Sequence, residues 1–354
     1  MSDWTRFLRL AIGLFAALTL GMLALIVWAN PYRNLPFVGT DRPLMDGNQR
    51  YMYPSIARDL SFDSGVFGNS SVRFLPPALL DRELGGSFAV LGMDAATPYE
   101  QMRLARLFHE VRAPAAPATV IHGIGAAWCE REESYRRFTP RPFPEWMYDH
   151  NPWNDALYVL NSGTLEVTGR VLLYKLGLRD RMHFEPNGFG DALPDKSKFD
   201  LARVRKIIYG SEEPKPVEPA DPPVVLSAGE RASWVYATHE LFGELLDLSP
   251  PATRMIVMFV PYHEYVLPRP GSEEEQSLIE CKTRIARMAS SRPNTLVLDF
   301  MRPSRINADE RNYWDQVHFG HDTAAEIVLA ISAAVQGQND ETIATVLHDG
   351  LMRQ

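Results

Sequence analysis

The N-terminal apolar run, Leu10 to Ala29, most constrains what this chain can fold into. It spans 20 residues without a charge and is almost wholly hydrophobic. As a helix rising about 1.5 Å per residue, it would reach about 30 Å, the thickness of a bilayer's hydrocarbon core. Arg6 and Arg9 precede the run, and Trp28 stands near its far end, where interfacial aromatic residues are frequent. The run therefore predicts a single transmembrane helix.

The positive charges ahead of this run predict its orientation. They favour a cytoplasmic N-terminus and transfer of the rest of the chain across the membrane. We expect residues 1–9 to form a cytoplasmic tail, residues 10–29 the anchor, and the C-terminal domain to lie in the periplasm of a bacterium, tethered to the inner membrane. A cleaved signal peptide and a buried core helix stay open as alternatives. The run exceeds the roughly 7–15 apolar residues of a signal peptide, which favours the anchor.

The composition of the chain limits the classes of function that it can have. The 354 residues, 45% of them hydrophobic, can bury an ample core. Acidic residues number 44 against 36 basic ones, and no basic patch alternates with aromatic residues, so we expect no nucleic-acid partner. Cys129 and Cys281 lie far apart without a motif; we expect two free, buried thiols, with a disulfide as the alternative. No zinc-site spacing occurs, and we expect neither a metal nor a cofactor.

Beyond a stalk and lead-in at residues 30–59, apolar runs alternate with amphipathic ones. The apolar runs predict strands at residues 60–67, 86–91, 118–125, 254–260 and 295–300. Capping boxes at Thr97–Glu100 and Ser272–Glu275 predict helix starts, and further helices are expected over residues 227–248 and 322–335. This alternation predicts an α/β fold with about five parallel strands over residues 60–354.

Residues 126–225 interrupt the alternation. They are rich in aromatic and charged residues, with a helical pattern near 165–176. The stretch Pro214 to Pro223 contains too many prolines for a helix or a central strand and predicts an extended connection. We interpret the whole block as an insertion or cap within the α/β domain.

Two short motifs stand near opposite ends of the α/β region, at residues 67–73 and 313–319. In the first, Ser70 follows Gly68 at the end of a predicted strand, as on a tight strand-to-helix turn. In the second, Asp315 and His318 are three residues apart, so one loop or helical turn can hold both. Nucleophilic acyl transfer uses these residue types, because histidine accepts the serine proton and the carboxylate orients the imidazole. The alternative for Ser70 is a helix cap.

The two motifs resemble the SGNH (GDSL-like) hydrolase superfamily, whose first block is Gly-Asp-Ser and whose last is Asp-x-x-His. The resemblance covers about residues 60–125 and 253–335. It implies a three-layer α/β/α sandwich, with Ser70 as the nucleophile, His318 as the base and Asp315 as its partner. Asn69 stands where the family has the Asp of its first block.

The inner blocks of the family match less well. By its place after the second strand, Gly92 would donate its backbone N–H to the oxyanion, together with the N–H of Ser70. After the third strand the family has Gly-x-Asn-Asp, whereas this chain reads Gly123-Ile124-Gly125-Ala126 and lacks the amide side chain. The Nε1–H of Trp128 is a candidate substitute. The candidates for substrate contact are Asn69, Trp128 and His263.

The anchor and the motifs together look like membrane-tethered SGNH-like proteins of the bacterial envelope, several of which move or remove acetyl groups on exopolysaccharides. The resemblance implies an O-acyl (acetyl) esterase or acyltransferase acting on an envelope polysaccharide or another acylated glycan, with polysaccharide-assembly proteins as candidate partners. The missing third-block Asn keeps a non-catalytic SGNH-like scaffold or glycan-binding protein open. A lipase or thioesterase is a third alternative, for which the charged insertion shows no acyl groove.

Overall fold

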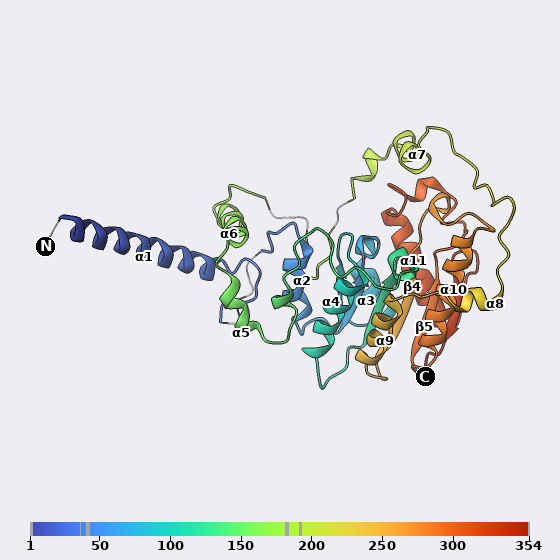
Figure 1. Cartoon of the computed structure of the whole chain (residues 1–354), viewed down its shortest axis with the longest axis horizontal. Helices are drawn as coiled ribbons and strands as arrows, with labels where there is room; N and C mark the ends of the chain where they lie inside the picture. The colour runs from blue at the N-terminus through green and yellow to red at the C-terminus, as the bar shows by residue number, and fades with distance from the viewer. Residues whose placement is uncertain (1–2, 36, 40–42, 181–183, 191–192, 353–354) are drawn as a thin grey trace. The chain divides into compact units, whose positions relative to one another are not determined.

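The fold is described from a computed structural model over residues 3–35, 37–39, 43–180, 184–190 and 193–352 (Figure 1). The chain forms two compact units. Unit 1 comprises residues 1–55 and 144–184, and unit 2 comprises residues 56–143 and 185–354. The first two residues of the predicted cytoplasmic tail lie outside the described residues.

Unit 2 contains one six-stranded sheet in the order β2-β1-β3-β4-β5-β6. The strands are β1 Ser64–Gly68, β2 Phe88–Gly92, β3 Thr119–Ile124, β4 Arg254–Phe259, β5 Thr295–Asp299 and β6 Thr345–Asp349. The first five run parallel and are almost completely buried, as strands of parallel sheets usually are. The predictions of an α/β fold and of five parallel strands are therefore confirmed.

Two features of the sheet differ from expectation. The predicted strand at residues 60–67 begins later, at Ser64, and Leu60 is exposed. The edge strand β6 pairs antiparallel with β5 and was not predicted. Its residues are only half-buried or exposed, so the apolar run that marks the other strands is weak there. An edge strand of this kind is stabilised by its pairing with β5 rather than by its own burial.

Helices connect the strands of unit 2. They are α3 Pro77–Leu84, α4 Pro98–Glu110, α7 Leu201–Tyr209, α8 Ala228–Ala232, α9 Thr238–Leu248, α10 Glu273–Ala289 and α11 His321–Val335. The helix α4 packs against β1 and α9, α10 packs against β5 and β6, and α11 packs against α3. The predicted start of α4 is confirmed, because Thr97 Oγ1 accepts from the Glu100 N–H while the Glu100 carboxylate accepts from the Thr97 N–H.

Two helix predictions need correction. Ser272 caps α10 as expected, but the Glu275 carboxylate accepts from the N–H of Gly271 at 2.6 Å and so does not complete the expected box with Ser272. The helix expected over residues 227–248 is broken into α8 and α9. The guanidinium of Arg284 donates to backbone carbonyl groups at the end of α8 and just beyond it, and thereby satisfies acceptors that a helix end leaves free.

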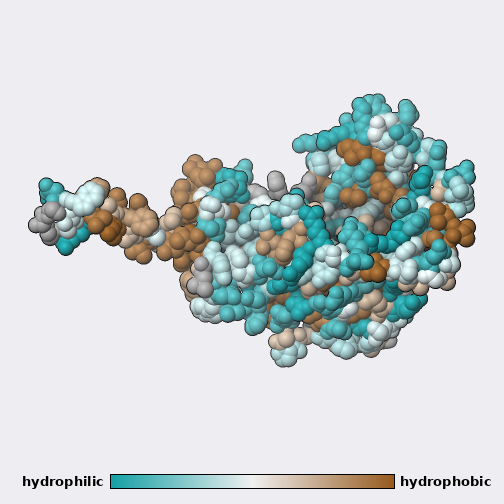
Figure 2. Space-filling view, viewed as in Figure 1, coloured by the Kyte–Doolittle hydropathy of each residue, from teal (hydrophilic) through white to brown (hydrophobic). Residues whose placement is uncertain are grey.

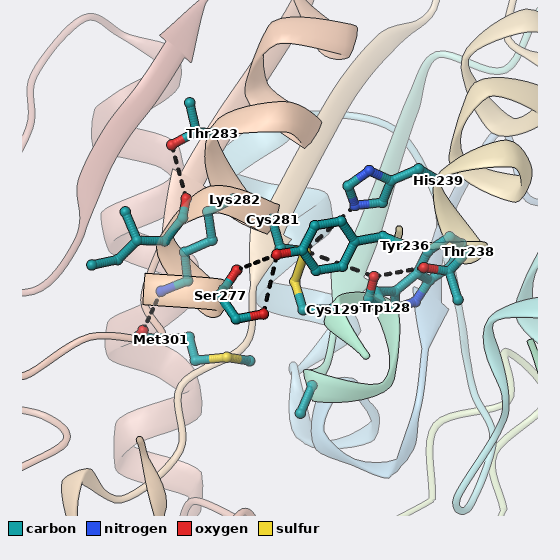
Figure 3. The surroundings of a disulfide bond; sticks show 12 residues. Trp128, Cys129, Tyr236, Thr238, His239, Ser277, Cys281, Lys282, Thr283 and Met301 are labelled. Atoms are coloured by element: carbon teal, nitrogen blue, oxygen red, sulfur yellow. Dashed lines mark hydrogen bonds between the residues drawn. A yellow bond between two sulfur atoms is a disulfide. The ribbon is translucent and has the colours of Figure 1, made fainter. Parts of the chain in front are cut away.

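Cys129 and Cys281 form a disulfide bond (Figure 3), which corrects the expectation of two free thiols. Cys129 ends the short 3₁₀ helix η2 (Ala126–Cys129) that follows β3, and Cys281 lies in α10. The bond joins residues 152 positions apart. Beside it, the carbonyl of Trp128 accepts a hydrogen bond from Thr238 Oγ1. The disulfide thus fixes the loop after β3 to a helix of another part of the chain.

Unit 1 contains the N-terminal helix. Its helices are α1 Asp3–Ala29, α5 Pro152–Asp155 and α6 Ser162–Lys175, and α2 Gln49–Ala57 crosses from unit 1 into unit 2. The predicted apolar helix is confirmed: α1 is long and apolar enough to cross a membrane. Residues 144–184, from the middle of the predicted insertion, group with the N-terminal residues. The proline-rich stretch over residues 214–223 is neither helix nor strand, as predicted.

Candidate active site

The fold brings Ser70, Asp315 and His318 together beyond the carboxyl end of β1. His318 Nε2 lies 2.7 Å from Ser70 Oγ, and His318 Nδ1 lies 2.6 Å from Asp315 Oδ2. Because an ionised carboxylate can only accept, Nδ1 carries a proton and Nε2 is left to accept from the Ser70 hydroxyl. The three side chains therefore form the hydrogen-bonded relay that nucleophilic acyl transfer uses.

Glycines at the ends of three strands allow the Ser70 turn to lie close to the sheet. The turn is the 3₁₀ helix η1 (Ser70–Phe74), and its Val72 side chain is completely buried. A Cβ atom added to Gly68 or Gly92 would lie 2.9 or 2.8 Å from a methyl group of Val72, and one added to Gly123 would also collide with this side chain. Val72 therefore fills the space that these glycines leave and fixes the turn on the sheet.

The loop that carries the acid and the base is fixed by its own hydrogen bonds. Asp315 Oδ1 accepts from the backbone N–H groups of Val317 and His318, both at 2.9 Å. The Trp314 N–H donates to the carbonyl of His318 at 2.8 Å. Ser71 Oγ donates to the carbonyl of Val317 at 3.2 Å and so links this loop to the Ser70 turn. Ser71 is buried, which makes it a positioning residue rather than a second nucleophile.

Hydrogen bonds keep Asp315 ionised. Burial by itself raises the pKa of this carboxyl group, but the bond from His318 Nδ1 and the backbone N–H donors outweigh burial. The pKa of Asp315 is therefore lowered from its ordinary value. A carboxylate that stays charged at neutral pH holds His318 in the required tautomer and stabilises the imidazolium that forms during proton transfer.

A cavity of about 510 Å³ opens beside the triad. Its charged side chains outside the triad are Arg73, Asp94, Arg141, Lys198, Asp200 and Arg203. Arg73 and Arg141 both form ion pairs with Asp94. Lys198 and Arg203 are exposed, and neither forms an ion pair with a carboxylate of the described residues. The sequence did not single out these cations, because only the folded chain places the residue 193–207 segment beside Ser70.

Two backbone N–H groups near the end of β2, those of Gly92 and Ala95, differ in their position relative to the cavity. Gly92 is not among the residues that line the cavity. Ala95 does line it, in the turn between β2 and α4, with a φ angle of 51°. Among the described residues, the Ala95 N–H has no hydrogen-bond acceptor. Ala95 is therefore a second candidate donor, and its place in the loop directly after β2 was the available sequence signal.

The space beside Gly125, where the resemblance requires an Asn, is already occupied. A Cβ atom at Gly125 would lie 2.7 Å from Asn69 Nδ2 and 2.8 Å from the Tyr262 hydroxyl oxygen. Asn69 Nδ2 donates to this hydroxyl at 3.4 Å, and Asn69 Oδ1 accepts from the Ser71 N–H at 3.0 Å. Asn69 does not line the cavity. Its contacts support the Ser70 turn rather than the predicted substrate contact.

The structure does not bring Trp128 or His263 to the cavity, which corrects both predictions. Trp128 is buried, and its Nε1–H donates to Gln101 Oε1 at 3.1 Å, so it cannot serve as an oxyanion donor. His263 is also buried. Its Nδ1 accepts from the Tyr265 N–H, and its Nε2 lies 3.3 Å from the Tyr209 hydroxyl oxygen. His263 thus helps to hold α7, which contributes to the cavity wall.

No protein-family model matches the chain, and no curated protein matches it. Over the described residues, no cluster of three or more His, Cys, Asp or Glu side chains could hold a metal ion.

Proposed function

We propose that this chain is a membrane-tethered SGNH-like serine O-acyl esterase or acyltransferase that acts on an envelope polysaccharide in the periplasm. The observation that carries the proposal is the relay Ser70–His318–Asp315, which opens onto a cavity. The three-layer architecture of SGNH hydrolases is part of the proposal and agrees with the mostly parallel sheet. The apolar α1 and the disulfide support anchorage with the catalytic unit in an oxidising compartment.

The chemistry has two half-reactions. Ser70 Oγ attacks the ester carbonyl carbon while its proton passes to His318 Nε2, and the tetrahedral intermediate forms. When this intermediate collapses, the bond to the leaving oxygen breaks, and His318 returns the proton to that oxygen. The acyl group is left on Ser70. Water or a sugar hydroxyl then attacks the acyl-serine, His318 again accepts and returns a proton, and Ser70 is regenerated.

Hydrogen-bond donors must stabilise the negatively charged oxygen of the tetrahedral intermediate. We assign this role to the N–H of Ser70 together with the N–H of Ala95, in place of the Gly92 N–H that the resemblance implies. Each such donor contributes about 3 kcal/mol to transition-state stabilisation. The lack of an Asn at Gly125 makes the site poorer by one donor than the family pattern, and we therefore expect slow turnover.

A second candidate function follows from the same deficiency. A non-catalytic SGNH-like scaffold that binds glycan needs the cavity but no oxyanion donor at residue 125. The hydrogen bonds that join His318 to Asp315 and to Ser70 favour the enzyme, because binding alone does not require this proton relay.

The test is acyl transfer from a small activated ester. The full chain in detergent would be mixed with an aryl acetate, with product release followed optically and protein acetylation by intact mass and peptide mapping. We expect a burst of product and an acetyl group on Ser70. The Ser70→Ala variant should show neither, whereas Ser71→Ala should still be acetylated on Ser70, although more slowly because it loses the hydrogen bond to Val317.

Each outcome decides between the two candidates. An adduct on Ser70 that the Ser70→Ala variant lacks supports the enzyme. A folded wild-type protein that gives no burst and no adduct would support the glycan-binding scaffold instead. Acetylation that persists in the Ser70→Ala variant would exclude Ser70 as the nucleophile.

A further inference from the structure

The last turn of α1 belongs to the core of unit 1. Ile26 is completely buried and packs with Leu35 and Val159, which come from two other segments of the unit. Leu165 of α6 packs against this cluster. Cleavage after Ala29 would remove Ile26 and leave the rest of the cluster uncovered. The packing therefore favours an α1 that remains attached to the folded chain.

Beyond this core, unit 1 exposes an unusual set of large apolar side chains. At the end of α6 and in the turn that follows, Leu173, Leu176 and Leu178 are 40%, 62% and 72% exposed. Aromatic side chains elsewhere in the unit are also exposed, at Phe37, Trp153 and Tyr158. Figure 2 shows hydrophobic residues gathered over α6 and the adjoining end of α1. Exposing so much apolar surface to water is unfavourable, which indicates that another phase covers it.

The residue types in this set indicate that a lipid surface covers the exposed apolar side chains. Exposed Lys175 and Arg179 flank Leu176 and Leu178 in the chain. Leucine and aromatic side chains beside basic ones are typical of segments that lie in the headgroup region of a bilayer. α6 also packs directly against α1, the one helix of the described chain that could span the membrane. Because α6 packs against α1, a membrane-spanning α1 would place α6 beside the bilayer. Lipid can therefore cover the exposed side chains without an additional protein partner.

We propose that unit 1 is seated in the bilayer interface at the C-terminal end of α1, with Leu173, Leu176, Leu178 and Trp153 in contact with lipid. The inference rests on the membrane anchorage proposed for α1 and is independent of the proposed acyl chemistry. It assigns a second membrane contact to a segment some 120–150 residues beyond the anchor.

The test uses the full chain in vesicles of phosphatidylcholine and phosphatidylglycerol. A single new cysteine at Leu176→Cys would carry an environment-sensitive fluorophore, since the two native cysteines are engaged in the disulfide. Leu18→Cys in α1 is the positive control, and Leu329→Cys, an exposed leucine of α11, is the matched negative control. Lipids with a nitroxide near the headgroup would act as quenchers for residue 176, and lipids with a nitroxide deep in the acyl chain would act as quenchers for residue 18, which lies near the middle of the apolar run.

We expect the label at residue 176 to shift to shorter wavelength and to lose at least about half of its intensity to the lipid quencher, while the label at residue 329 is unaffected. Quenching at residue 18 combined with no quenching at residue 176 would overturn the inference and leave the anchor intact. A wavelength shift at residue 176 without lipid quenching would also overturn it, because protein would then cover the surface. No quenching at residue 18 would overturn both the anchorage and the inference.

Discussion

Lys198 and Arg203 are the residues that most directly suggest what the cavity accepts. Both line it beside the triad, and neither is neutralised by a carboxylate of the described chain, in contrast to Arg73 and Arg141, which share Asp94. Unpaired cations at the edge of a site attract anionic ligands over several ångströms at moderate salt. We therefore expect that the glycan proposed as substrate carries carboxylate or other acidic groups.

Charge reversal tests this expectation. In a Lys198→Glu, Arg203→Glu double variant, KM for an acidic O-acetylated glycan should rise at least about tenfold, equivalent to about 1.4 kcal/mol of lost binding. Turnover of a neutral aryl acetate should stay within about twofold, because the triad is untouched. The control is Lys196→Glu, which changes an exposed lysine outside the cavity. Equal losses with both substrates would contradict a role in recognising charge.

At the scale of elements, the disulfide is the strongest constraint on the region near the site. It fixes η2 to α10, and η2 begins directly after Gly125. The N–H of Ala126 in η2 donates to the Tyr262 hydroxyl, which also accepts from Asn69. The turn that carries Ser70 is thus connected to the disulfide loop by two consecutive hydrogen bonds. Loss of the disulfide should therefore affect the stability of the fold more than the geometry of the site.

Removal of the disulfide has a predictable cost. A Cys129→Ala, Cys281→Ala variant should lose about 3–5 kcal/mol of unfolding free energy, since the bond closes a loop of 152 residues and restricts the unfolded chain. The loss would be measured by urea denaturation under non-reducing conditions. Wild-type protein treated with a reductant should show a similar loss, which serves as the control. A midpoint equal to that of the untreated wild type would show that the bond does not stabilise the fold.

At the scale of the whole of unit 2, three buried histidines and the half-buried His239 should make stability depend on pH. Burial lowers the pKa of His109 to about 4, of His122 to about 3 and of His239 to about 4, and it also lowers the pKa of His263. The folded protein keeps these side chains neutral, whereas the unfolded chain takes up protons below a pKa of about 6.5. Their contribution to stability is therefore complete above that pH and is lost as the pH falls toward 4.

The size of this effect can be measured. Between about pH 7.5 and pH 5.5, each of His109, His122 and His239 should lower the unfolding free energy by about 1 kcal/mol, as determined by urea denaturation. A His109→Gln variant, which retains a hydrogen-bonding side chain near Ser249, should show a decrease smaller by one such step. A constant free energy over this pH range would mean that the histidines are not kept neutral in the folded state.

The sequence by itself determined the features that depend on neighbouring residues. The apolar α1, the five parallel strands and the Thr97 cap were all predictable, because burial patterns and caps involve residues at most a few positions apart. The pairing of Asp315 with His318 was predictable for the same reason, since it spans three residues. Placing Ser70 beside that pair required the resemblance, because the two motifs are far apart in the chain.

The tertiary structure decided whatever depends on distant contacts. It joined Cys129 to Cys281 and added β6 to the edge of the sheet. It also placed the Arg284 guanidinium where it donates to carbonyl groups at the end of α8. It also buried Trp128 and brought Ala95 to the cavity instead of Gly92. Local sequence does not predict these outcomes, because each depends on groups that are far apart in the chain and meet only in the folded structure.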